Sequence, residues 1–133
     1  ATDSHLILRN DVYDRVPLKA AWGEGLVTLL GDAAHPTTPN LGQGAGQAIE
    51  DGIVLARIFR GSANVVAALR NYEGQRRART AYITNLSWRL GKMSQWENPT
   101  AGWLRNTLLR AVPLSIQRRQ LAKVLKFDEQ AIR

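Results

Sequence analysis

The residues best suited to chemistry lie in one stretch, residues 31–52 ("GDAAHPTTPNLGQGAGQAIEDG"). It holds five of the eleven glycines, two of the five prolines, one of the two histidines and three carboxylates of the 133-residue chain. Asp32 follows a short apolar run, residues 26–30, and α/β proteins tend to bind ligands where such a strand ends. A carboxylate at this position can accept hydrogen bonds from the hydroxyl groups of a ligand.

The loop after Asp32 is stiff and open to a flat molecule. Pro36 and Pro39 fix the backbone φ angle, whereas Gly42 and Gly44 let the backbone approach a ligand with no Cβ in between. A helical pattern begins at about Gly42 or Gly44, and the free N–H groups and positive dipole end of such a helix favour negative charge nearby. These features together describe a site for a planar, polyhydroxylated, anion-forming ligand, and a flavin has all three properties.

The stretch matches neither of two common nucleotide-binding loops, and interpretations that involve no ligand stay open. Gln47 stands where the fingerprint G-x-G-x-x-G needs its third glycine, and no G-K-[ST] sequence of a P-loop is present. A connection rich in Gly and Pro is common without any ligand, and Asp32 could cap the turn after the strand. For His35 we favour a side chain satisfied by loop backbone over one that contacts ligand.

Two short strands and about four helices must position this stretch, which makes the fold class an α-rich α/β protein. Apolar runs predict strands at 6–13 and 26–30, the second fully buried because it is apolar and bounded by glycines. Apolar spacings of three and four predict four helices, at 44–60, 64–94, 103–112 and from Pro113 onward. We divide the chain at Gly61 into 1–60, with the strands and the Gly-rich loop, and 61–133, a helical region of the same compact unit.

Two arginines interrupt the apolar face of the long helix. Arg76 and Arg79 need carboxylate or backbone partners if they are buried, or they extend to an edge of the helix and stay solvated. Glu50 and Asp51, in the preceding helix, are the partners we expect, and their role would be structural.

The composition limits the classes of partner. The net charge of +7 divides into −2 for residues 1–60 and +9 for residues 61–133. We interpret the basic half as solvated helix faces, because its charges are scattered among apolar residues with no aromatic-rich stretch to bind nucleic acid. There is no cysteine and only two histidines, so no metal site is expected. No apolar run is long enough to span a membrane and no leader is evident, so a cytoplasmic location is expected.

Residues 31–52 closely resemble the second flavin-binding motif of the FAD-dependent aromatic-ring monooxygenases. These have the para-hydroxybenzoate hydroxylase fold, and the similarity is to the branch with salicylate hydroxylase, urate hydroxylase and zeaxanthin epoxidase. The resemblance extends upstream through "VYDRVPLKAAWGEGLVTLLGDAAH" and downstream through "LARIF" and "ALRNYEGQRRARTAYI". It covers roughly residues 5–95.

The resemblance implies a set of cofactor-binding residues: Gly31, Asp32, Pro39, Leu41, Gly42, Gln43 and Gly44. Asp32 would bind the ribityl hydroxyls of FAD, with Gly31 allowing the approach. Pro39 would lie against the flavin ring, and no residue is assigned as catalytic. The backbone from Leu41 to Gly44 would face the pyrimidine edge of the isoalloxazine.

The resemblance also implies an activity. In the family, FAD is reduced by NAD(P)H and reacts with O2 to give a C4a-hydroperoxide, which transfers one oxygen atom to a small, usually aromatic substrate. The helix dipole near N1–C2=O would help to hold the reduced, anionic flavin.

The chain departs from the family pattern in what it lacks. The G-x-G-x-x-G unit that binds the ADP part of FAD, the middle Asp-Gly motif and the substrate-roofing sheet are absent from this sequence. We therefore expect the C-terminal third of a Rossmann-like enzyme, inactive alone, whose uncovered strands dimerise, swap or pair with an upstream portion. The alternatives are a non-catalytic helical fragment and a basic module that binds an acidic partner or nucleic acid.

Overall fold

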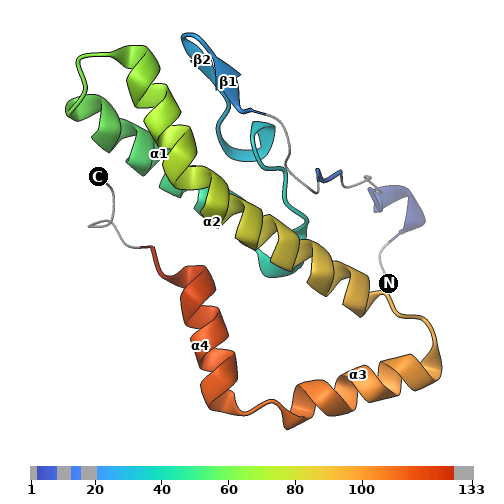
Figure 1. Ribbon diagram of the computed structural model, residues 1–133. Helices are drawn as coiled ribbons and strands as arrows, with labels where there is room; N and C mark the ends of the chain where they lie inside the picture. The colour runs from blue at the N-terminus through green and yellow to red at the C-terminus, as the bar shows by residue number, and fades with distance from the viewer. Residues whose placement is uncertain (1–2, 9–12, 16–20, 128–133) are drawn as a thin grey trace.

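The computed structural model describes residues 3–8, 13–15 and 21–127, and two long helices form its centre (Figure 1). Helices α1 and α2 lie side by side, while α3 and α4 form a V-shaped arm beside them. A small hairpin and three 3-10 helices (η1 to η3) complete the described part. The bounds are η1 Ser4–Leu6, β1 Gly23–Glu24, β2 Val27–Thr28, η2 Gly31–Ala33, η3 Pro39–Leu41, α1 Gly44–Arg60, α2 Val65–Ser94, α3 Pro99–Ala111 and α4 Leu114–Leu125.

The four predicted helices are confirmed, and local capping explains the end of α1 and the beginnings of α2 and α3. The N–H of Gly61 closes α1 by donating to the Ile58 carbonyl at 3.2 Å. Asn64 caps α2 by accepting from the Ala67 N–H at 3.0 Å. The third helix begins earlier than predicted, at Pro99, because the Asn98 side chain caps it and proline is favoured in the first turn.

The strand predictions are wrong in extent and in burial. Residues 26–30 contribute only β2, which pairs with β1 antiparallel, and Leu26 and Val27 are 72% and 67% exposed. The predicted strand at 6–13 does not form in its described part, where η1 ends at Leu6, and residues 9–12 lie outside the described residues. An apolar run becomes a buried strand only with neighbouring strands and a covering layer. Among the described residues, the two-residue strand β1 is the only strand that pairs with β2.

The core lies where the hairpin, the loop and the two central helices meet. The ring of Trp22 lies 5.5 Å from that of His35 and 6.0 Å from that of Tyr72. Val54 and Ile58 of α1 pack in the same cluster. Burying these side chains holds residues 22–35 against α1 and α2.

The arm is joined to the centre at the C-terminal end of α4. Arg79 Nη2 donates to the Val124 carbonyl at 3.3 Å, and Lys123 Nζ lies 4.5 Å from the ring centroid of Tyr82. Most apolar side chains of the arm, such as Trp103 and Leu108, are exposed. Of the helices described, none has the length and apolar character that a bilayer crossing requires.

Candidate functional site

The loop of residues 31–43 begins with a backbone turn that needs glycine. Gly31 has φ +59°, and a Cβ added to it would lie 3.2 Å from the Cβ of Ala48. The next residue, Asp32, is exposed at the start of η2. Its Oδ1 lies 3.8 Å from where a Cβ on Gly44 would be, so the carboxylate reaches the beginning of α1. No described hydrogen bond supports the alternative that Asp32 caps the turn.

The N-terminus of α1 lacks a side-chain cap. Gly42 adopts the left-handed conformation with φ +63°, and Gln43 occupies the cap position without a side-chain hydrogen bond to the helix. The first N–H groups of a helix have no intrahelical partner. The exposed carboxylate of Asp32 therefore lies next to the uncapped N–H groups of α1. The carboxylate can accept hydrogen bonds from hydroxyls, and the N–H groups can donate to an anionic oxygen.

The predicted binding residues lie along this loop and at Gly44, the first residue of α1. Gly31 is buried and anchors it, while Asp32, Pro39 and Gly42 are exposed. Leu41, Gln43 and Gly44 are half-buried. The structure brings Asp32 and Gly44 together at the helix N-terminus, and it places Pro39 and Leu41 in η3.

Hydrogen bonds fasten the loop to α2 in what we term the loop clamp (Thr37, Thr38, Asn40, Thr84 and Ser87). The hydroxyls of Thr37 and Thr84 are 2.9 Å apart. Thr38 Oγ1 donates to Ser87 Oγ at 2.9 Å, and Ser87 Oγ donates to the Thr38 carbonyl at 2.7 Å. Asn40 Nδ2 donates to the Ser87 carbonyl at 3.2 Å. The clamp fixes the backbone that the loop presents to solvent.

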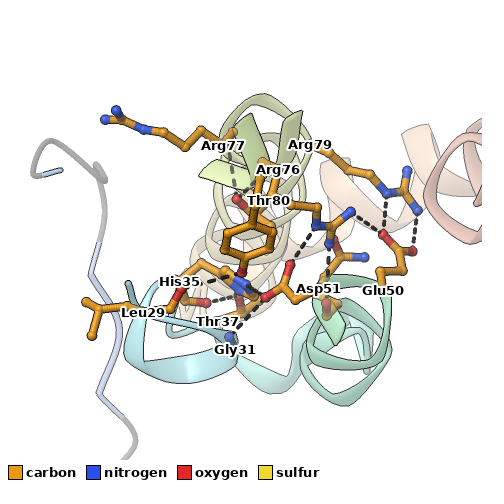
Figure 2. Close-up of polar contacts among 12 residues, drawn as sticks. Leu29, Gly31, His35, Thr37, Glu50, Asp51, Arg76, Arg77, Arg79 and Thr80 are labelled. Carbon is orange, nitrogen blue, oxygen red and sulfur yellow. Dashed lines mark hydrogen bonds and ion pairs between the residues drawn. The ribbon is translucent and has the colours of Figure 1, made fainter. Parts of the chain in front are cut away.

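A buried ionic network (His35, Gln47, Glu50, Asp51, Arg76 and Arg79) lies beneath the loop, as Figure 2 shows in part. Arg76 donates from Nε to Asp51 Oδ1 at 2.6 Å and from Nη1 to Glu50 Oε2 at 2.7 Å. Its Nη2 donates to Gln47 Oε1 at 2.9 Å. Arg79 makes a two-pronged contact with Glu50, both bonds at 2.6 Å. The predicted pairing is confirmed. The alternative of an arginine extended to solvent is wrong for Arg76, which is 2% exposed.

Asp51 connects this network to the loop. Its Oδ2 accepts from the Gly31 N–H at 2.9 Å and lies 2.7 Å from Nε2 of His35 (Figure 2). The prediction that loop backbone satisfies the His35 ring is therefore wrong, because the partner is a carboxylate from α1. His35 is fully buried, which separates it from the exposed surface where Asp32 lies. Its ring is a link between the loop and the helix.

Hydrogen bonds and neighbouring arginines keep both carboxylates ionised. Burial by itself would raise the pKa of Glu50, but the hydrogen bonds and charges of Arg79 and Arg76 outweigh it and hold that pKa below its usual range. Burial likewise opposes ionisation of Asp51, yet hydrogen bonds from His35, Gly31 and Arg76 lower its pKa. The contacts thus stabilise the charged forms.

This lowering predicts acid sensitivity. A carboxyl whose pKa is lower in the folded state contributes stability that is complete above its unfolded pKa, about 4, and is lost as the pH falls through the folded value. We expect the free energy of unfolding, measured by urea titration, to decline as the pH falls from about 5 to 3. Asp51→Asn should be less stable at pH 7 and should lose less on acidification. If the free energy of unfolding falls equally with pH in the wild type and in Asp51→Asn, Asp51 is not the source of the acid sensitivity.

Comparison with known sequences identifies relatives over most of the chain. Residues 9–87 match the family described as FAD binding domain. Aurachin C monooxygenase/isomerase of Stigmatella aurantiaca is 48% identical over 109 residues, which cover 82% of this chain and 28% of that protein. The 2-heptyl-3-hydroxy-4(1H)-quinolone synthase of Pseudomonas aeruginosa is 49% identical over 100 residues, covering 75% and 26%. The chain therefore spans about a quarter of the length of these relatives.

Solved structures agree with this assignment. HpxO of Klebsiella pneumoniae, in a variant complexed with FAD, superposes with a TM-score of 0.69 and 32% identity, over 76% of this chain and 26% of that one. The same enzyme complexed with FAD and uric acid gives a TM-score of 0.67 and 31% identity over 73% and 25%. The family match over residues 9–87 includes the loop, the uncapped helix and the network beneath them. The chain belongs to the FAD-binding domain family of the flavin-dependent monooxygenases.

Proposed function

We propose that this chain supplies the flavin-facing part of the FAD site in a flavin-dependent monooxygenase. The observation that carries the proposal is the exposed carboxylate of Asp32 beside the uncapped N-terminus of α1. A ligand with a hydroxyl-bearing chain attached to an anion-forming ring needs a carboxylate to accept from its hydroxyls and nearby N–H groups to donate to its ring oxygen. The described residues therefore fit the ribityl and isoalloxazine parts of FAD.

Each part of the loop has a role in this proposal. Asp32 accepts hydrogen bonds from the ribityl hydroxyls, and Gly31 keeps the approach free of a side chain. The backbone of Leu41, Gly42, Gln43 and Gly44 lines the pyrimidine edge, where the positive end of α1 favours negative charge. Pro39 borders the ring from η3. The loop clamp and Asp51 hold these groups in place, so little order has to be imposed when the cofactor binds.

The proposed reaction is the insertion of one oxygen atom from O2 into a small aromatic substrate, with NAD(P)H as the reductant. FAD, when bound, supplies the redox and oxygen-activating chemistry. This activity is proposed for a protein in which the chain is joined to segments that hold the ADP part of FAD and cover the substrate. The exposed apolar residues of the hairpin, including Leu26 and Val27, give those segments a surface to pack on.

Titration of the purified chain with FAD tests the proposal through flavin fluorescence and the visible spectrum. We expect saturable binding that Asp32→Ala weakens about 10- to 100-fold, because a hydrogen bond to a charged group contributes about 1.5–3 kcal/mol. Asp32→Asn should be intermediate, since an amide oxygen still accepts. Glu97→Ala removes an exposed carboxylate outside the loop, after the end of α2, and should leave the affinity unchanged. Equal affinities for Asp32→Ala and Glu97→Ala would refute the role of Asp32.

A further inference from the structure

Gly91, near the C-terminal end of α2, occupies a position where alanine would make a more stable helix. A glycine inside a helix costs backbone entropy on folding, and Gly91 is not among the glycines with a positive φ. It is buried, and a Cβ added to it would overlap Nδ2 of Asn40 and lie 3.2 Å from Cγ of the same side chain. What the glycine provides is therefore room for Asn40.

This room lets Asn40 join the middle of η3 to α2. Its Nδ2 donates to the Ser87 carbonyl at 3.2 Å and to Thr38 Oγ1 at 3.0 Å. Turning the amide over would only exchange its nitrogen and oxygen, so a methyl group at Gly91 has to displace the whole side chain from both acceptors. An open pocket of about 340 Å³ beside Asn40 can take up the displaced side chain. The substitution therefore breaks two hydrogen bonds of the loop and leaves the helix intact.

Asn40 is the last residue that fastens the loop to α2 before α1 begins. Between Asn40 and Gly44, the described part of the chain has no further hydrogen bond from the loop to α2. The N–H of Gly42 donates at 2.9 Å to the Pro39 carbonyl, which is a contact within the loop itself. Pro39 and Leu41 flank Asn40 in η3, and the proposed function places both against the flavin. The position of these two residues relative to α2 therefore depends on Asn40.

We propose that Asn40 and Gly91 are a positioning pair, which holds η3 where Pro39 and Leu41 contact the flavin. The inference rests on the proposed function, because that function makes η3 part of a cofactor site. Gly91 acts through Asn40, and Asn40 acts through its two neighbours in η3. A methyl group at Gly91 therefore disturbs the cofactor site while it favours the helix.

The variant Gly91→Ala separates positioning from stability. We expect the dissociation constant for FAD, measured by titration of flavin fluorescence, to rise about 3- to 10-fold, as for the loss of an ordinary hydrogen bond. The visible spectrum of the saturated complex should move toward that of free FAD. The midpoint of urea unfolding should change little, because the gain in helix propensity offsets the lost bonds. A large fall in the midpoint would show that Gly91 serves the packing of the fold, which overturns the inference.

Gly74→Ala is the matched control for this variant. Gly74 is an exposed residue of the same helix, and a Cβ added to it would meet nothing within 4 Å. We expect the control to raise the midpoint of unfolding and to leave the affinity for FAD and the flavin spectrum unchanged. Equal affinities for Gly74→Ala and Gly91→Ala would overturn the inference.

A double-mutant cycle tests whether the two residues act through each other. Asn40→Ala removes the amide above Gly91 and should weaken FAD binding by the same factor of about 3 to 10. Adding Gly91→Ala to Asn40→Ala should cause no further loss, since the new methyl group then meets no amide. A second loss of similar size in the double variant would mean that Gly91 acts through another contact, which overturns the inference.

Amide hydrogen exchange needs no cofactor, so it distinguishes a failure of this inference from a failure of the proposed function. Gly91→Ala should speed the exchange of the Gly42 N–H. The Gln47 N–H, which donates to the Gln43 carbonyl at 2.9 Å, should exchange as before. Unchanged exchange at Gly42 overturns the inference whether or not FAD binds. Faster exchange at Gly42 in a chain that binds no FAD supports the hold of the pair on η3 and contradicts the proposed function instead.

Discussion

Replacing Arg76 with leucine is expected to lower the free energy of unfolding by about 3–5 kcal/mol, the usual cost of removing one partner from a buried ion pair. Arg76 is 2% exposed and donates to Asp51, Glu50 and Gln47. Without it, the fully buried carboxylate of Asp51 loses its arginine partner and keeps hydrogen bonds from His35 and the Gly31 N–H. Urea unfolding followed by circular dichroism measures the change.

Two further variants identify the mechanism. Arg76→Lys keeps the charge but loses the planar guanidinium that contacts several acceptors. We therefore expect it to lose most of the stabilisation that Arg76→Leu loses. Arg89→Leu, an exposed position on the same helix, should change stability by about 0.5 kcal/mol or less. A loss as small for Arg76→Leu as for Arg89→Leu would show that the network does not stabilise the fold.

Replacing Trp22 with alanine is expected to cost about 3–5 kcal/mol, because it removes the largest side chain of the core cluster. The indole packs on His35 and Tyr72, so its loss would detach residues 22–35 from the two central helices. The other three tryptophans are at least 38% exposed. We therefore expect the emission of Trp22, which is 4% exposed, to shift most when the unfolding of the wild type is followed by intrinsic fluorescence.

Trp22→Phe is the matched control for this prediction. Among the described residues, Nε1 of Trp22 is buried without a hydrogen-bond partner, so removing it sacrifices no polar contact. We expect phenylalanine to cost about 1–2 kcal/mol, from lost volume alone. A loss as large as that of alanine would indicate that the indole N–H has a partner that the packing does not reveal.

The sequence predicts the helical part of this structure well because its signals are local. Asn64 and Gly61 mark the boundary between α1 and α2, and apolar spacing defines both. Charged residues on an apolar face carry long-range information, since a buried guanidinium requires an anion. This is why Arg76 and Arg79 could be paired with Glu50 and Asp51 in advance.

Contacts without such a signal could not be predicted. The hydroxyl groups of Thr38 and Ser87 show no periodicity that would point to each other, although they are 49 residues apart in sequence and in direct contact. The sequence favours backbone partners for His35, because the carboxylate that contacts it lies 16 residues away on another element. The run 26–30 has the composition of a buried strand, but burial depends on the layer that covers it rather than on its own residues.

The loop clamp has a consequence for the order in which the chain is assembled. It joins residues 37–40 to partners 47 to 49 positions later, whereas Arg76 closes loops of only 25 to 29 residues. The longer closure costs about 0.5 kcal/mol more chain entropy, so we expect the contacts of Arg76 between the two central helices to form slightly ahead of the clamp and to provide the surface on which the loop packs. During synthesis on the ribosome the clamp can form only after Ser87 has been translated and has itself left the exit tunnel, so the loop emerges before its partners on α2 can reach it.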